Sequence, residues 1–176
     1  VAVSDSSGYV YDEDGINVDT LKQLKEVERA RIVKYTDAHP KAVFTPAGGD
    51  SIWTIKAGLA FPCATQNELN DADAKTLVAN GVIAVTEGAN MPSTLEAIEV
   101  FHEAGVSFGP AKAANAGGVA VSALEMAQNS QRTPWTFEEV DSKLYDIMKN
   151  IYANSAAAAK EFDHEGNLVV GANIAG

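Results

Sequence analysis

Residues 82–94 read Val-Ile-Ala-Val-Thr-Glu-Gly-Ala-Asn-Met-Pro-Ser-Thr, and this stretch decides the fold. The apolar run at 82–86 predicts a strand, and Ser93 with Glu96 has the spacing of a capping box, which marks the start of a helix. The same order of apolar run, polar turn and helix occurs at 57–81. Strands that alternate with helices in this way predict an α/β fold, a parallel sheet with flanking helices.

The rest of the chain extends this pattern on both sides. Further elements are expected as a strand at 1–4, a helix from Asn17 to about Tyr35, a loop at 39–51 and a strand at 106–108. Residues 1–116 then hold the βα repeats, and 117–176 are expected to be mainly helical.

Composition limits the class of protein. The 176 residues include 46% hydrophobic ones and carry a formal net charge of −11. This length suffices for one domain with its own core. The negative charge disfavours binding to nucleic acid and to anionic membranes. Since Cys63 is the only cysteine and no signal peptide or membrane span is evident, a cytoplasmic location is expected.

The histidines and the charged residues at 22–31 do not indicate a binding site. The three histidines lie at no metal-ligand spacing from Cys, Asp or Glu, so no metal is expected. Basic and acidic residues alternate between Lys22 and Arg31, where Lys25 and Arg29 also lie. They are expected to form a solvated helix face.

Lys112–Ser122 reads Lys-Ala-Ala-Asn-Ala-Gly-Gly-Val-Ala-Val-Ser and predicts a ligand-binding turn before a helix. Gly117 and Gly118 would let a ligand approach the backbone closely, and the helix start favours an anion. Val119 and Ser122 are three residues apart and would share one helix face. A small carboxylate with a short aliphatic stem fits this arrangement.

Six segments resemble, in order and spacing, the coenzyme domain of the hexameric glutamate dehydrogenases, within the Glu/Leu/Phe/Val dehydrogenase family: 4–8, 61–68, 87–94, 112–122, 125–130 and 171–176. The resemblance implies a Rossmann-like sheet and a single partial dinucleotide-binding domain over 1–176. The first βα unit of the family, with its Gly-rich phosphate loop, would precede residue 1. The chain, which begins inside an apolar run, is therefore expected to be a piece of a longer protein.

The resemblance also implies which residues bind coenzyme and substrate. Asp5 and Ser6 would line the adenosine ribose, and NADP is expected rather than NAD because the likeness is to NADP-using bacterial enzymes. Val119 would contact the substrate, and Ser122 would donate to the side-chain carboxylate of glutamate. Uncharged groups would meet the nicotinamide and its ribose from three segments: Ala64, Thr65, Gln66, Gly88, Asn90 and Asn115. Without the resemblance, a turn is the better interpretation of Asp5 and Ser6, and a cap or turn role is the better interpretation of Asn90 and Asn115. For Ser122, the nearby Gly117 and Gly118 favour a substrate contact over a bond to its own helix backbone.

The activity implied is NADP-dependent, reversible oxidative deamination of L-glutamate to 2-oxoglutarate and ammonium by a homohexamer. The family's catalytic Lys and Asp belong to a substrate domain outside these residues, so no catalytic residue is expected here and the chain alone is expected to be inactive. Two alternatives stay open: a non-enzymatic α/β module that binds a nucleotide or a partner, and a leucine or phenylalanine dehydrogenase of the same fold. Ser122 disfavours the latter, because a buried hydroxyl without a partner costs about 1–3 kcal/mol.

Overall fold

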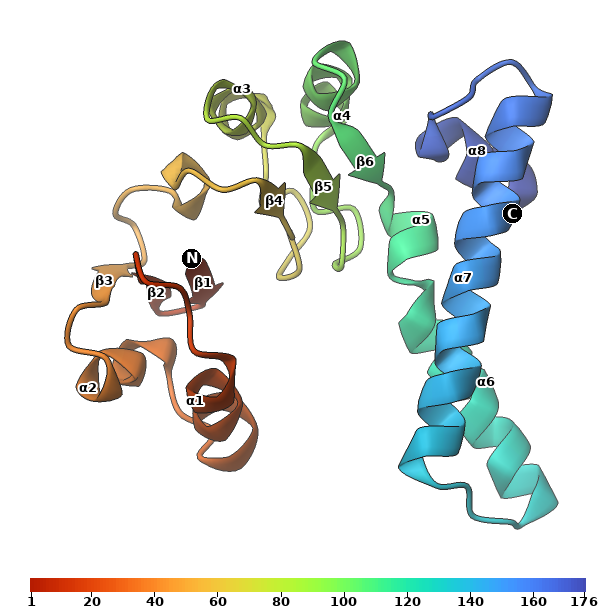
Figure 1. Ribbon diagram of the computed structural model, residues 1–176, viewed down its shortest axis with the longest axis horizontal. Coiled ribbons are helices and arrows are strands. Elements are labelled where there is room, and N and C mark those ends of the chain that lie inside the picture. The colour runs from red at the N-terminus through yellow and green to blue at the C-terminus, as the bar shows by residue number, and fades with distance from the viewer.

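The computed structural model describes all residues, Val1 to Gly176, and contains two three-stranded sheets. The parallel sheet has the order β4-β5-β6, with β4 at Leu59–Ala60, β5 at Ala84–Thr86 and β6 at Ser107–Gly109. Helices α3 (Asp71–Ala79) and α4 (Leu95–Glu103) follow β4 and β5 and lie next to each other on one side of this sheet (Figure 1). The predicted α/β architecture is therefore confirmed.

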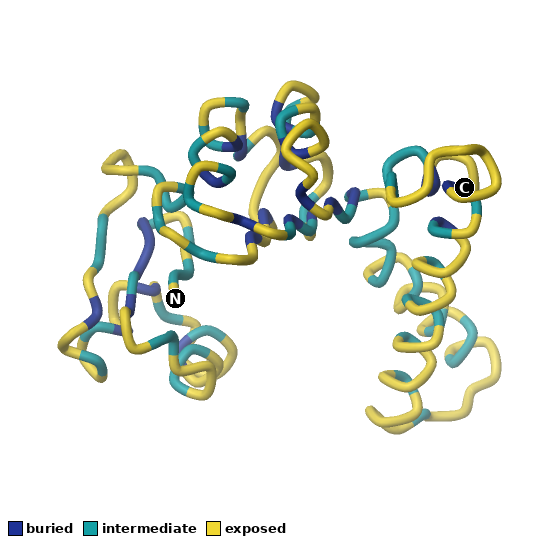
Figure 2. Tube along the Cα trace, turned by 45° about the horizontal axis from the view of Figure 1, so that its top comes forward, coloured by how far each residue is buried: buried dark blue, intermediate teal, exposed yellow.

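The main core lies between this sheet and its two helices. Phe101 of α4 stacks on Phe108 of β6 with 5.8 Å between ring centroids, and both rings are buried. Leu69, Leu77 and Val85 complete the centre of this cluster. Buried residues concentrate in this part of the chain, whereas the long C-terminal helices are largely exposed (Figure 2).

The two helix starts in this part differ in how well the sequence predicted them. Asn70 caps α3 as predicted, because its side chain accepts from the N–H groups of Ala72 and Asp73. The predicted capping box at Ser93 is wrong: Thr94 caps α4 by accepting from the N–H of Ala97 at 3.3 Å. Ser93 forms a parallel bridge with Leu69, which holds it in extended backbone one residue before the cap.

The second sheet is antiparallel and has the order β1-β2-β3, with β1 at Ala2–Asp5, β2 at Gly8–Tyr11 and β3 at Val43–Pro46. The first strand pairs with β2 in this sheet and not with the parallel sheet. The expectation of a loop at 39–51 is wrong, because this segment contains β3. The close approach of β2 to β3 explains why residues 43–46 form a strand. A Cβ on Gly8 would lie 2.1 Å from the Thr45 carbonyl oxygen. Only glycine allows β2 and β3 to meet at this point.

The helix expected from Asn17 to Tyr35 is broken. Asn17 caps its first turns as predicted, by accepting from the N–H of Thr20. The helical backbone stops at Arg29, which has a φ of 54°. The break lets the N–H of Ile32 reach the Asp5 carboxylate at 2.9 Å, a bond that a continuous helix would not allow. The elements are α1 (Val18–Lys22), a π-helical turn (Gln23–Val27), a 3-10 turn (Ile32–Lys34) and α2 (Tyr35–Ala38).

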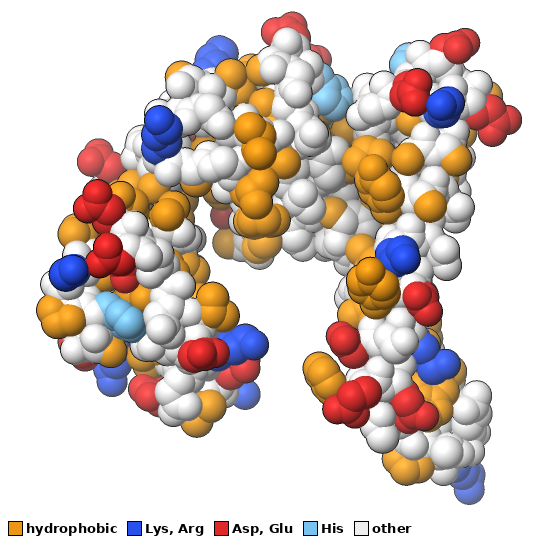
Figure 3. Space-filling model, viewed as in Figure 1, with side chains coloured by type: hydrophobic (Ala, Val, Ile, Leu, Met, Phe, Trp, Pro, Cys, Tyr) orange, Lys and Arg blue, Asp and Glu red, His pale blue; other side chains and the backbone are white.

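The last third is helical, as predicted. It comprises α5 (Ala111–Ala114), α6 (Ala116–Gln131), α7 (Phe137–Glu161) and α8 (Leu168–Ala175). Thr136 and Glu139 form the predicted capping box at the start of α7. Helices α6 and α7 form a hairpin that extends away from the parallel sheet, and a wide open space separates it from the α1–α2 region (Figure 3).

Candidate functional site

Two loops lie side by side beyond the carboxyl ends of β4 and β5. The N–H groups of Gly88 and Ala89 donate to the Pro62 carbonyl at 3.0 and 3.2 Å, and the N–H of Asn67 donates to the Met91 carbonyl at 3.0 Å. A Cβ on Gly88 would lie 2.5 Å from the Cys63 sulfur, so a larger residue here would displace the Cys63 side chain. The loops after β4 and β5 therefore form one continuous surface at this edge of the sheet.

Asn90 and Asn115 are 25 residues apart in sequence and meet on this surface. The Asn115 side-chain amide donates to Asn90 Oδ1 at 2.7 Å and to the Ala89 carbonyl at 3.1 Å. Thr65 and Gln66 are exposed at the neighbouring loop. Beside them the N–H of Ala64 donates to the Glu68 carboxylate at 2.8 Å. The carboxyl ends of the parallel strands thus gather uncharged hydrogen-bonding groups at one edge of the sheet.

Helix α6 leads away from this edge. The turn expected at 112–118 is wrong, because α5 and α6 make this segment helical and place Gly117 and Gly118 inside α6. Asn115, Val119 and Ser122 have i, i+4, i+7 spacing and share one helix face. Val119 is 76% exposed, and the exposed Ser122 hydroxyl donates to the Gly118 carbonyl of its own helix at 3.2 Å.

Asp5 and Ser6 lie at the end of β1, in the antiparallel sheet. The Asp5 carboxylate accepts hydrogen bonds from the N–H groups of Ser7 and Ile32 and from the Lys25 ammonium, each at 2.9 Å. Burial raises the pKa of Asp5, but these bonds outweigh it and hold the pKa well below its usual 3.8. The expected solvated face is wrong at Lys25, which this ion pair engages. Asp5 is therefore an anionic anchor for the segment that follows α1.

Ser6 has a basic neighbour that the sequence alone did not indicate. The guanidinium of Arg31 donates to the Ser6 hydroxyl, and both side chains are exposed. Asp5 brings them together, because it holds the backbone of Ile32 next to β1. A hydroxyl and a guanidinium at the end of a strand are groups that bind phosphate oxygens.

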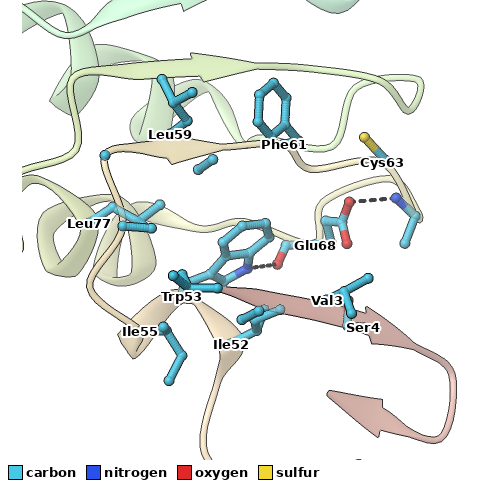
Figure 4. Close-up of a pocket in the computed structure, with 16 residues that line it drawn as sticks. Val3, Ser4, Ile52, Trp53, Ile55, Leu59, Phe61, Cys63, Glu68 and Leu77 are labelled. Carbon is cyan, nitrogen blue, oxygen red and sulfur yellow. Dashed lines mark hydrogen bonds between the residues drawn. The ribbon is translucent and has the colours of Figure 1, made fainter. Parts of the chain in front are cut away.

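An apolar cavity of about 750 Å³ lies between the two sheets. Figure 4 shows β1 and β4 on opposite sides of it and running in the same direction. The Trp53 indole lies at its centre and donates to the Glu68 carbonyl at 3.2 Å. Each of these strands is at the end of its sheet order, so each has one unpaired edge.

Other classes of site are not seen. No group of three or more His, Cys, Asp or Glu side chains is arranged to hold a metal ion. None of the helices combines the length and apolar character needed to cross a membrane.

Comparison with known proteins assigns the chain to a family. Residues 1–176 match the Glutamate/Leucine/Phenylalanine/Valine dehydrogenase family over their whole length. The chain belongs to this family.

The relatives are glutamate dehydrogenases of greater length. The chain is 54% identical over 181 residues to the NADP-specific glutamate dehydrogenase of Helicobacter pylori strain J99, and the match covers 100% of the chain and 40% of the relative. It is 51% identical over 179 residues to the NAD(P)-specific enzyme of Xylanibacter ruminicola, again over 100% of the chain and 40% of the relative. The chain thus spans about 40% of the length of these dehydrogenases.

A solved structure supports the same assignment. The glutamate dehydrogenase of Plasmodium falciparum superposes with a TM-score of 0.91 at 46% identity, and the match covers 99% of the chain and 38% of that protein.

Proposed function

We propose that this chain is the coenzyme-binding part of a glutamate dehydrogenase that catalyses the reversible NADP-dependent oxidative deamination of L-glutamate to 2-oxoglutarate and ammonium. The observation that carries the proposal is the contact between Asn90 and Asn115 at the carboxyl edge of the parallel sheet. Ligands of open parallel sheets bind at this edge. The similarity to enzymes named NADP-specific glutamate dehydrogenase supports the reaction.

The donors and acceptors at this edge fit a nicotinamide and its ribose. A carboxamide and two ribose hydroxyls need paired donors and acceptors, which the side chains of Thr65, Gln66, Asn90 and Asn115 supply without charge. Ala64 and Gly88 lie in the same two loops, and we assign them to the coenzyme site with these side chains. When bound, the coenzyme supplies the hydride acceptor, and these residues orient it.

The adenosine end fits NADP better than NAD. Arg31 and Ser6 can donate together to a phosphate on the ribose, and Asp5 is already saturated by protein donors and so does not need ribose hydroxyls. An acid that reads the ribose hydroxyls favours NAD, whereas hydroxyl and cationic donors accommodate a 2′-phosphate.

Val119 and Ser122 extend the Asn115 face of α6 and are the residues we assign to glutamate. Ser122 can exchange its weak bond to the Gly118 carbonyl for one to the substrate's side-chain carboxylate, while Val119 contacts the aliphatic stem. We assign the groups that activate the substrate to the part of the full-length enzyme outside these residues, about 60% of the relative's length. The parent enzyme is proposed to be a homohexamer.

The cavity between β1 and β4 is a place where a further strand of the full-length enzyme could lie. A further parallel strand inserted there would pair with the free edges of both strands and join the two sheets into one. We assign this place to the strand that carries the Gly-rich phosphate loop. On this assignment the 176 residues alone bind dinucleotide weakly and do not turn over substrate.

The test is a reduction assay on the full-length enzyme, with L-glutamate or L-leucine as substrate and NADP⁺ or NAD⁺ as coenzyme. Glutamate-dependent reduction of NADP⁺ is expected to be the fastest of the four combinations. Faster reduction with leucine would indicate the leucine dehydrogenase alternative. No turnover with either amino acid would refute the proposed reaction.

A further inference from the structure

Glu87 is a buried carboxylate for which the proposed function has no role. It directly follows β5, is only 3% exposed, and extends the strand pairing by donating its N–H to the Gly109 carbonyl at 3.0 Å. None of the four ion pairs of the chain includes it. Burying a carboxylate without a cation is unfavourable unless its oxygens accept hydrogen bonds, so its bonding partners indicate its role.

Both oxygens accept bonds from backbone groups of different segments. Oε1 accepts from the N–H of Ser93 at 3.1 Å, and Oε2 accepts from the N–H of Ala111 at 2.7 Å. Ser93 lies at the end of the loop that begins at Glu87, and Ala111 is the first residue of α5. The carboxylate therefore closes the 87–93 loop and attaches it to α5.

The two attached segments carry Asn90 and Asn115. Asn90 lies within the loop, and Asn115 ends α5 with its N–H bonded to the Ala111 carbonyl at 3.0 Å. The Asn115 side chain then returns to Asn90 at 2.7 Å. Glu87, Ala111, Asn115 and Asn90 thus form a closed ring of contacts. The length of the Glu87 side chain sets the spacing of the two amides.

We propose that Glu87 is a positioning residue for the nicotinamide end of the coenzyme site, an inference that rests on the proposed function. It touches neither coenzyme nor substrate and acts through Asn90 and Asn115. The adenosine end, at Asp5 and Ser6, belongs to the antiparallel sheet and shares no hydrogen bond with Glu87. Loss of the Glu87 bonds therefore weakens binding of the nicotinamide and leaves binding of the adenosine end unchanged.

Two variants break bonds to this carboxylate. Glu87→Gln keeps the shape, but its amide NH2 cannot accept, so the bond from Ser93 or the bond from Ala111 is lost. Ala111→Pro removes the N–H itself, at the first position of a helix, where proline is tolerated. The preceding Pro110, with φ −70° and ψ 145°, already has the extended backbone that a residue before proline requires. Ser93→Ala is the matched control, because the buried Ser93 hydroxyl has no hydrogen-bond partner.

The experiment measures binding of NADPH, by nicotinamide fluorescence, and of adenosine 2′,5′-bisphosphate, by calorimetry, to the full-length enzyme and its variants. Both bond-breaking variants should bind NADPH at least about tenfold more weakly, the loss typical of one charge-assisted hydrogen bond. Binding of the bisphosphate should stay within about twofold of wild type, and Ser93→Ala should match wild type for both ligands. NADPH binding at wild-type strength in either folded variant, or equal weakening for both ligands, would overturn the inference.

Hydrogen exchange separates this inference from the proposed function. The amide of Ser93 or of Ala111, whichever loses its acceptor, should exchange at least about tenfold faster in Glu87→Gln than in wild type, whether or not a coenzyme binds. A wild-type enzyme that fails to bind NADPH would refute the proposed function, and faster exchange at either amide would still support the Glu87 contacts. Unchanged exchange at both amides would overturn the role of Glu87 even in an enzyme that binds NADPH.

Discussion

Gly171 lies in α8 against the backbone of α7, and alanine at this position should separate the two helices. A Cβ there would lie 2.0 Å from the Ser155 carbonyl oxygen and 3.0 Å from the Ala159 side chain. Overpacking usually costs about 1–3 kcal/mol, and here the atom that is met is backbone, which cannot rotate away. Alanine recovers about 1 kcal/mol of helix propensity. Because the contact with backbone places the cost at the upper end of this range, we expect Gly171→Ala to lower the free energy of unfolding by about 2 kcal/mol.

Gly118→Ala is the matched control for this substitution, since Gly118 is also helical and a Cβ there would have no neighbour within 4 Å. It should raise the free energy of unfolding by about 0.5–1 kcal/mol. Urea unfolding of both variants, followed by helical circular dichroism, gives the comparison. A Gly171→Ala variant within about 0.5 kcal/mol of wild type would refute the close contact between α7 and α8.

Three further predictions follow from the caps, the Asp5 contacts and the adenosine end. Thr94→Ala should lower the free energy of unfolding by about 1 kcal/mol, because it removes the cap of α4. Urea unfolding of Thr94→Ala beside Ser93→Ala checks this. A larger loss of stability for Ser93→Ala would show that Ser93 is the cap. The pKa of Asp5 is lowered in the folded state, so the stabilisation by its carboxylate is fully present above about pH 4 and is lost as the pH falls below that. The urea midpoint should therefore fall less steeply between pH 6 and pH 3 in Asp5→Asn than in wild type. Parallel curves would contradict a stabilising role of the Asp5 carboxylate. Arg31→Ala should reduce kcat/KM for NADP⁺ by about tenfold and leave kcat/KM for NAD⁺ unchanged, as expected for loss of one charge-assisted bond to a phosphate. Equal losses for both coenzymes would show that Arg31 does not bind the phosphate.

Local sequence signals predicted the parallel sheet and its helices well. The alternation of apolar runs and caps between Ala57 and Gly109 depends on neighbours in sequence, and Asn70 shows this, since its two bonds reach only three residues ahead. The meeting of Asn90 and Asn115 followed from one topological rule, that parallel strands present their carboxyl ends at a single edge.

Contacts between distant segments account for what the sequence missed. Ser93 is not the cap that the sequence predicted, because it pairs with Leu69, 24 residues earlier. The 17–35 helix is broken where Ile32 bonds to Asp5, and β3 exists because β2 offers it an edge. The sequence analysis did not predict the role of Glu87, because that role depends on a bond to Ala111, 24 residues later. The signal for it in the sequence is an acid that directly follows a buried apolar strand.

The most direct test of the central claim is the rate of glutamate-dependent NADP⁺ reduction by the full-length enzyme carrying Ser122→Ala. Ser130→Ala is its control, since Ser130 is an exposed serine on the same helix. Removing one hydrogen bond to a carboxylate should lower kcat/KM for glutamate by about ten- to a hundredfold, while Ser130→Ala keeps the wild-type rate. Unchanged glutamate turnover in Ser122→Ala would contradict the assignment of this face of α6 to the substrate.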